Sequence, residues 1–113
     1  MKNPDIKTSI LQMLATKGDG RTFAEFESIP GFSGNIGLET STENLFLWFS
    51  CSPEAVQVVC ELLQEQMITI KTTSVLTYQA DGLLPRYKTG SEGAGYKKPR
   101  WLPVAIYKGP KFG

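Results

Sequence analysis

The strongest structural signal in this chain lies in residues 52–68, which read Ser52-Pro53-Glu54-Ala55-Val56-Gln57-Val58-Val59-Cys60-Glu61-Leu62-Leu63-Gln64-Glu65-Gln66-Met67-Ile68. Serine followed by proline is typical of a helix start, because the hydroxyl caps free backbone amides and proline fits the first helical position. Apolar side chains then recur at helical spacing, at Val56, Val59, Cys60, Leu63 and Met67. We therefore expect a helix over 53–66 with a polar outer face.

The residues that follow this helix have a strand pattern. Apolar and polar side chains alternate over 68–73, and β-prone residues continue through 75–78. Residues 101–107 alternate in the same way, and Pro103 predicts that this second strand lies at an edge or starts late. Between the two strands, residues 82–100 hold four glycines and two prolines, which predicts an extended, mobile loop.

The first thirty residues predict two helices. The first covers 6–15 and places four apolar side chains on one face: Ile6, Ile10, Met13 and Leu14. Gly18 supplies its stop. Thr22 and Glu25 have the spacing of a capping box, so a second helix begins there and ends at Pro30-Gly31.

The segment that links this pair to the later helix is less regular. Residues 31–37 are rich in glycine and predict a turn region. The short apolar run 45–49 predicts a buried strand. That strand leaves an alternative open, in which 45–79 form a βαβ unit with the 45–49 strand paired to 68–72.

Composition bounds the class of protein. The chain has 113 residues, 41% hydrophobic and 20% charged, which is typical of one globular domain. It has no histidine, which excludes Ser-His-Asp triads, Cys-His dyads and histidine metal sites. Residues 1–5 lack a secretory pattern, and the longest aliphatic and aromatic run has five residues, so we expect a soluble cytoplasmic protein.

The two cysteines, Cys51 and Cys60, predict buried free thiols. On one helix they would lie about 13 Å apart, whereas a disulfide requires Cα atoms within about 7 Å. Two thiols also fall short of a zinc site. We expect no metal and no cofactor.

Charge is distributed unevenly along the chain. Residues 1–81 carry five basic and ten acidic side chains, whereas residues 82–113 carry seven basic and one acidic. An acidic body with a basic C-terminal third predicts a partner for that third, either phosphate or an acidic protein face. The alternative is a solvated loop that pairs with its own acidic body.

The basic third also interleaves cations with aromatic rings, which suits nucleic acid because cations neutralise phosphates and flat rings stack on bases. The candidate nucleic-acid-binding residues are Arg86, Tyr87, Lys88, Tyr96, Lys97, Lys98 and Arg100. The alternative is that both tyrosines and Trp101 pack at the base of the loop while the cations stay hydrated.

No motif indicates catalysis. Gly90 and Gly95 have the spacing of a phosphate-binding loop, but Tyr96 stands where lysine belongs and Lys97, which Lys98 follows, where a hydroxyl belongs. The paired carboxylates, such as Glu61 with Glu65, lie on the predicted exposed face of an ordinary helix, and no feature of the sequence indicates a pocket around them. We expect a non-enzymatic protein.

The order of elements resembles a winged helix-turn-helix domain. The resemblance lies in residues 10–14, through Gly18, into 22–26, and again in 58–68, where a helix passes into the first wing strand. It implies an α+β fold with three helices, a small antiparallel sheet and a long basic wing loop. Winged-helix domains commonly bind DNA through the third helix and the wing.

This chain departs from that pattern in its candidate recognition helix, 53–66. The helix contains no Lys or Arg, and its carboxylates at Glu54, Glu61 and Glu65 oppose docking on phosphates. Gln57 and Gln64 could in principle read adenine edges. Either the wing leads DNA binding or the fold binds protein.

Our leading hypothesis is a small DNA-binding regulator that contacts phosphates through the basic aromatic loop. The alternative is a protein-binding adaptor or inhibitor that uses an acidic helix face, Glu54, Gln57, Glu61 and Gln64, together with the apolar run 45–49. That run would also allow a homodimer. A weaker third hypothesis is a structural subunit of a larger assembly.

Overall fold

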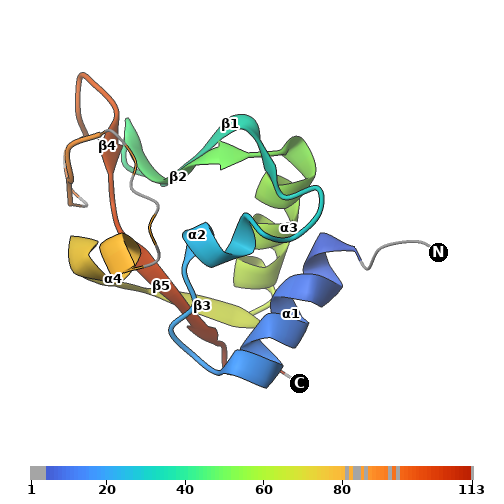
Figure 1. The fold of residues 1–113 in the computed structure, drawn as a ribbon. Helices are drawn as coiled ribbons and strands as arrows, with labels where there is room; N and C mark the ends of the chain where they lie inside the picture. The colour runs from blue at the N-terminus through green and yellow to red at the C-terminus, as the bar shows by residue number, and fades with distance from the viewer. Residues whose placement is uncertain are drawn as a thin grey trace.

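The computed structural model describes residues 5–80, 82, 85, 87–91, 93 and 95–112. Within these residues the chain forms an α+β domain with four helices and two small sheets (Figure 1). In chain order the elements are α1 Ile6–Lys17, α2 Phe23–Phe26, β1 Ser33–Glu39, β2 Leu45–Cys51, α3 Pro53–Gln64, β3 Ile68–Thr72, α4 Val75–Ala80, β4 Arg100–Trp101 and β5 Val104–Lys108.

The predicted helix starts are confirmed by their caps. The Thr22 hydroxyl and the Glu25 carboxylate form the expected capping box of α2. The Ser52 hydroxyl accepts a hydrogen bond from the Ala55 amide at the start of α3. Gly18, at a φ of 85°, ends α1. α2 is shorter than expected, since it makes a single turn and the chain continues in turns to residue 32.

The strands form two separate sheets. One has the order β1-β2-β4, in which β2 pairs antiparallel with β1 and parallel with β4. The other pairs β3 with β5 antiparallel, from Ile68 opposite Lys108 to Thr72 opposite Val104, and Arg21 bridges to Ile106 of β5. β2 and β3 therefore lie in different sheets, and the alternative βαβ pairing is wrong.

Two secondary-structure predictions are also wrong. Residues 31–37 are not a turn region, because β1 runs through most of them. Its glycines allow close approach instead: a Cβ at Gly34 would lie 2.5 Å from the Cys51 carbonyl oxygen, and one at Gly37 would lie 2.7 Å from the Phe46 ring. Residues 75–80 are a helix and not a strand, because α4 carries Tyr78 into the core, which outweighs local β propensity.

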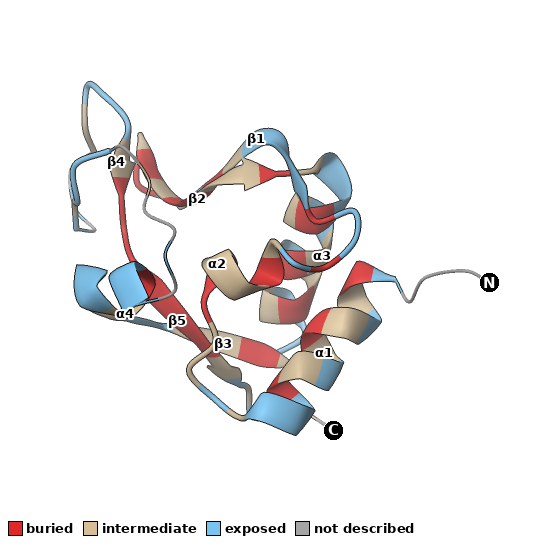
Figure 2. Ribbon diagram, in the orientation of Figure 1, coloured by how far each residue is buried: buried red, intermediate tan, exposed pale blue. Residues whose placement is uncertain are grey.

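Large aromatic side chains make up much of the core, which lies between the helices and both sheets (Figure 2). The fully buried large side chains include Phe23, Phe26, Phe32, Tyr78 and Trp101. α2 lies between the two sheets (Figure 1), and its Phe23 ring stacks on Trp48 at 6.0 Å. Among the described residues, no helix is long and apolar enough to cross a membrane.

The buried face of α3 differs from the predicted stripe. Ala55, Val59 and Leu62 are buried, whereas Val56 and Leu63 are half-buried. The buried face is thus turned by about one residue, because α3 packs against both α1 and the β1–β2 sheet. The prediction that both cysteines are buried is wrong for Cys60, which is exposed, whereas Cys51 is buried and both thiols are free.

Candidate nucleic-acid interface

The basic loop, residues 82–100, is tied at its C-terminal end to the turn between β1 and β2. The Tyr96 amide donates to the Glu43 carbonyl at 3.0 Å, and the Arg100 amide donates to the Asn44 carbonyl at 2.7 Å. The Asn44 side-chain amide returns a bond to the Tyr96 carbonyl at 2.8 Å. These bonds fix the described part of the loop against the hairpin. The mobility of the loop stays a prediction.

Within the loop, Tyr96 acts as an internal brace. Its hydroxyl donates to the Ser91 carbonyl at 3.0 Å and accepts from the Ser91 amide at 2.9 Å. The Ser91 hydrogen bonds, helped by the Arg100 guanidinium, hold the pKa of the Tyr96 phenol below its ordinary value. That guanidinium lies 5.2 Å from the centre of the Tyr96 ring. Tyr96 therefore positions the loop and Arg100.

Four of the predicted nucleic-acid-binding residues line one pocket. This pocket, of about 350 Å³, is lined by Tyr87, Lys88, Lys98, Pro99 and Arg100. Lys97 is exposed on the same loop and does not line it. Arg86 lies outside the described residues. Three cations and a tyrosine thus share a concave surface that can receive an anionic ligand with a flat group.

Tyr87 is exposed and yet rigidly supported. Its side chain is 44% exposed, and its ring stacks on Phe49 with centroids 4.0 Å apart and planes inclined by 17°. Phe49 in turn contacts Phe46 at 5.1 Å. Trp101, by contrast, is buried at 1% exposure, so it packs at the base of the loop as the alternative expected.

Sequence reasoning missed Phe46 and Phe49 as part of this site. The whole run 45–49 was assigned to the core, but these two rings are only half-buried while Leu45, Leu47 and Trp48 are buried. Period-two alternation could have placed Phe46 on the outer face of β2. No sequence signal places Phe49 there, since it shares the parity of Leu45 and Leu47.

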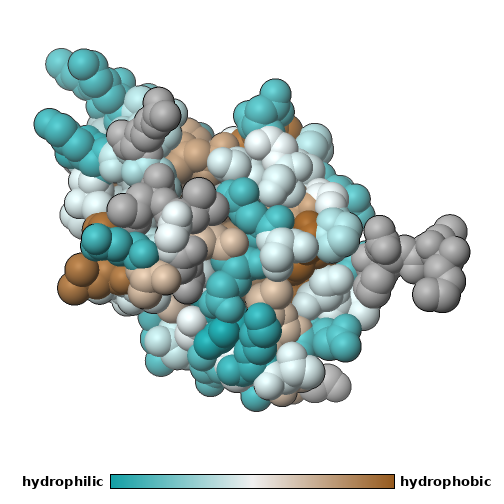
Figure 3. Space-filling view, in the orientation of Figure 1, coloured by the Kyte–Doolittle hydropathy of each residue, from teal (hydrophilic) through white to brown (hydrophobic). Residues whose placement is uncertain are grey.

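In the part of the chain that the structure describes, Lys88, Lys97, Lys98 and Arg100 of the basic loop form no ion pair with the acidic body. Among the described residues, the ion pairs are Lys7 with Glu65 and Arg21 with Glu25. The lysines of the basic loop take part in neither pair. The surface over this loop, at the upper left of Figure 3, is strongly hydrophilic. Two carboxylates, Glu39 and Glu43, lie near the neighbouring hairpin turn. Glu39 accepts the Asn44 amide there.

The alternative partner-binding residues lie on the outer face of α3. Glu54, Gln57 and Gln64 are exposed and Glu61 is half-buried. The Gln57 side-chain amide donates to the Glu61 carboxylate at 3.1 Å. These side chains are all polar and face solvent, but none of the four lines a described pocket.

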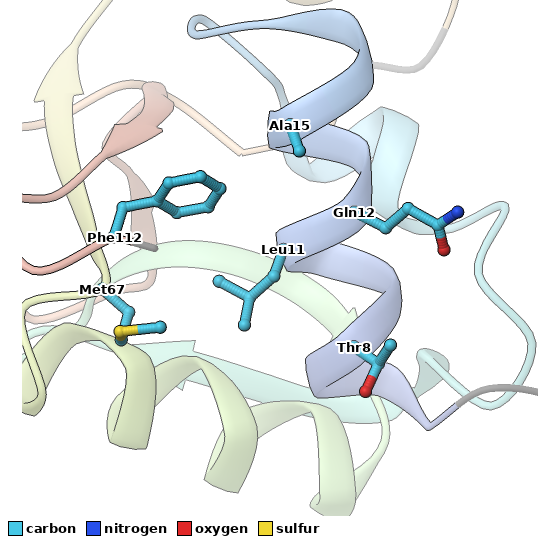
Figure 4. A pocket seen from close by; sticks show the side chains of 6 residues that line it. All are labelled: Thr8, Leu11, Gln12, Ala15, Met67 and Phe112. Atoms are coloured by element: carbon cyan, nitrogen blue, oxygen red, sulfur yellow. The ribbon is translucent and has the colours of Figure 1, made fainter.

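A second concave surface lies between α1 and two residues that flank the β3–β5 sheet, Met67 just before β3 and Phe112 after β5 (Figure 4). This apolar groove, of about 490 Å³, is lined by Thr8, Leu11, Gln12, Ala15, Met67 and Phe112. The Phe112 ring and Leu11 face each other across the opening, while the Gln12 amide points away. The groove can receive apolar side chains, and sequence reasoning did not identify it.

Within the described ranges, no cluster of three or more His, Cys, Asp or Glu side chains could hold a metal ion. The basic pocket beside Tyr87 and the apolar groove are two of the concave surfaces in the described structure. No protein-family model, curated protein or solved structure matches this chain.

Proposed function

We propose that the protein is a non-enzymatic nucleic-acid-binding protein that contacts phosphates through the basic loop. The observation that carries the proposal is the basic pocket, which Lys88, Lys98 and Arg100 line together with the exposed Tyr87. Phosphate contacts by Lys and Arg supply most of the sequence-independent affinity for nucleic acid. A regulatory role in transcription would be natural for such a small domain.

The element order supports a winged-helix-like interpretation of the fold. β3 and β5 form an antiparallel pair after α3. In the sequence, the basic loop falls between these two strands, as a wing does. The hairpin β1–β2 between α2 and α3, and the added helix α4, depart from that pattern. α3 contains no Lys or Arg. We therefore assign the contact to the loop and not to α3.

Fluorescence anisotropy with labelled single-stranded and duplex DNA tests this function. The wild type should bind at about 50 mM salt and lose affinity steeply towards about 200 mM. The combined substitution Lys97→Gln, Lys98→Gln and Arg100→Gln should weaken binding strongly. It should also flatten the salt slope for single strands by about 2, since three phosphate contacts are lost.

A matched control distinguishes the effect of where the removed positive charges lie from the effect of how many are removed. Lys17, Lys71 and Lys111 are exposed and lie outside the basic loop, so replacing all three with Gln changes the net charge equally. This control should retain nearly all of the wild-type affinity. Absence of binding at low salt, or an equal loss in both triple variants, would refute the proposed site.

A second candidate function is binding of a protein partner, which the apolar groove favours because apolar concavities anchor partner side chains. Where that partner also contacts the acidic outer face of α3, which does not line the groove, the charge reversals Glu54→Lys and Glu61→Lys would weaken capture of a basic partner, and nucleic acid would not bind. If the basic loop is the nucleic-acid-binding site, this double variant should bind nucleic acid with wild-type affinity.

A further inference from the structure

We propose that the basic pocket is a subsite for one unpaired base of a single-stranded nucleic acid, stacked on Tyr87 with its flanking phosphates on Lys88, Lys98 and Arg100. This inference rests on the proposed function and assigns its ligand class. The loop alone could serve any polyanion. The aromatic wall of the pocket is what selects a strand with free bases.

The first step is the orientation of the Tyr87 ring. One face of the ring is covered by Phe49 at a centroid distance of 4.0 Å, and the side chain is nevertheless 44% exposed. Phe49 belongs to β2, so the tyrosine is held on a strand and does not depend on the loop alone. Tyr87 also lines the basic pocket, so we infer that the ring borders the pocket on its side away from Phe49, where a flat base can continue the stack.

The second step is the surroundings of that ring. Lys88, Lys98 and Arg100 line the same pocket as Tyr87, so a stacked base would have its phosphates within reach of three cations. In the described structure, neither lysine has an ion pair to break before it can bind phosphate. The volume of about 350 Å³ lies at the lower end of the usual range for ligand sites, about 300–1,000 Å³. One nucleotide suits this space.

The third step is the preference for unpaired bases. Within a duplex both faces of each base are covered by its neighbours, so only edges and phosphates are presented. A stack on Tyr87 therefore requires a strand whose bases are splayed out. The element that would enter a major groove, α3, exposes Glu54 and has no Lys or Arg, which disfavours duplex docking.

The test compares single-stranded and duplex oligonucleotides of about 12 nucleotides, a length within the range of single-strand sites. Oligo-dT and oligo-U serve as the DNA and RNA strands, and the matching duplex has the same length. Wild type should bind either single strand more tightly than the duplex. Tyr87→Leu should weaken single-strand binding by about 5- to 150-fold, which corresponds to the loss of one stacked base.

Three further measurements make the result specific to stacking. Tyr87→Phe should keep the wild-type affinity, because the ring remains. The salt slope of Tyr87→Leu should equal that of wild type, because no phosphate contact is lost. A strand with phosphates but without bases should bind wild type and Tyr87→Leu equally. The matched control is Tyr107→Leu, which replaces a half-exposed tyrosine of β5. This variant should bind like wild type.

The outcomes distinguish the two proposals. If no oligonucleotide binds at low salt, the proposed function fails and this inference fails with it. If single strand and duplex bind equally, and Tyr87→Leu matches wild type while the loop-cation variant loses affinity, the function stands and the base subsite is refuted. Circular dichroism of each variant confirms that any loss occurs in folded protein.

Discussion

At the scale of single residues, the two thiols differ in exposure and therefore in reactivity. Cys51 is buried at the end of β2, and its burial, together with the nearby Glu27 carboxylate, raises the pKa of its thiol to about 12. The thiolate is the reactive form, and an ordinary free cysteine has a pKa of about 8.5. We expect iodoacetamide near that pH to label Cys60 alone in native protein, as read by mass spectrometry.

The pH dependence of thiol labelling follows from the raised pKa of Cys51. Because the pKa of Cys51 is raised, its thiolate stays scarce throughout the range in which an ordinary cysteine ionises. Raising the pH through that range should therefore leave Cys51 unlabelled. Cys60→Ser should take no label until denaturant is added, and rapid native labelling of Cys51 would contradict its burial.

At the scale of the elements, Ser52 links the hairpin to α3. Its hydroxyl caps α3 by accepting the Ala55 amide at 3.1 Å and donates to the Gly31 carbonyl at 2.6 Å. Loss of a helix cap of this kind costs about 1 kcal/mol and up to about 2 kcal/mol. Ser52→Ala should lower the free energy of unfolding by that amount in urea denaturation.

Ser41 provides the comparison for this substitution. It is exposed in the turn between β1 and β2, outside any helix cap. Ser41→Ala should change the free energy of unfolding by less than about 0.5 kcal/mol, as is usual at the surface. Equal stability of both variants would show that the cap of α3 contributes nothing.

Elements with local signals could be predicted from the sequence, and elements set by tertiary contact could not. The caps at Thr22 and Ser52 depend on residues within one turn of the chain, so they were predicted correctly. β1 forms because Gly34 and Gly37 let it approach β2 closely. This contact joins two strands, so the local sequence of β1 does not predict it. α4 forms because Tyr78 reaches the core.

The candidate site was predictable in its residue types but not in its geometry. Interleaved cations and rings marked the basic loop, and four of those residues do line one pocket. The sequence did not distinguish the roles of the two tyrosines: Tyr96 braces the loop through Ser91, whereas Tyr87 is exposed on Phe49. That difference depends on β2, which lies far away in sequence.

At the scale of the whole molecule, Tyr78 connects elements that are distant in sequence. Its hydroxyl donates to the Val104 carbonyl of β5 at 2.7 Å and accepts from the Phe23 amide of α2 at 3.2 Å. Leaving such buried groups without their partner costs about 1–3 kcal/mol. Tyr78→Phe should lower the free energy of unfolding by that amount in thermal or urea denaturation.

Tyr107→Phe is the control for this change, since Tyr107 is half-exposed and the same oxygen is removed. Its effect should stay within about 0.5 kcal/mol. If Tyr78→Phe were as stable as wild type, the hydroxyl would contribute nothing, and packing of the Tyr78 ring, which lies 4.9 Å from Trp101 and 5.3 Å from Trp48, would hold α4 in place.

The irregular register of β1 bears on how copies of this protein behave when crowded together. β1 forms one edge of its sheet, and three register shifts interrupt its pairing with β2. A straight edge strand is a template on which another chain can add itself and begin a fibril. Bulges bend such an edge and break its repeat, so β1 is a poor seed for aggregation although its outer side is exposed.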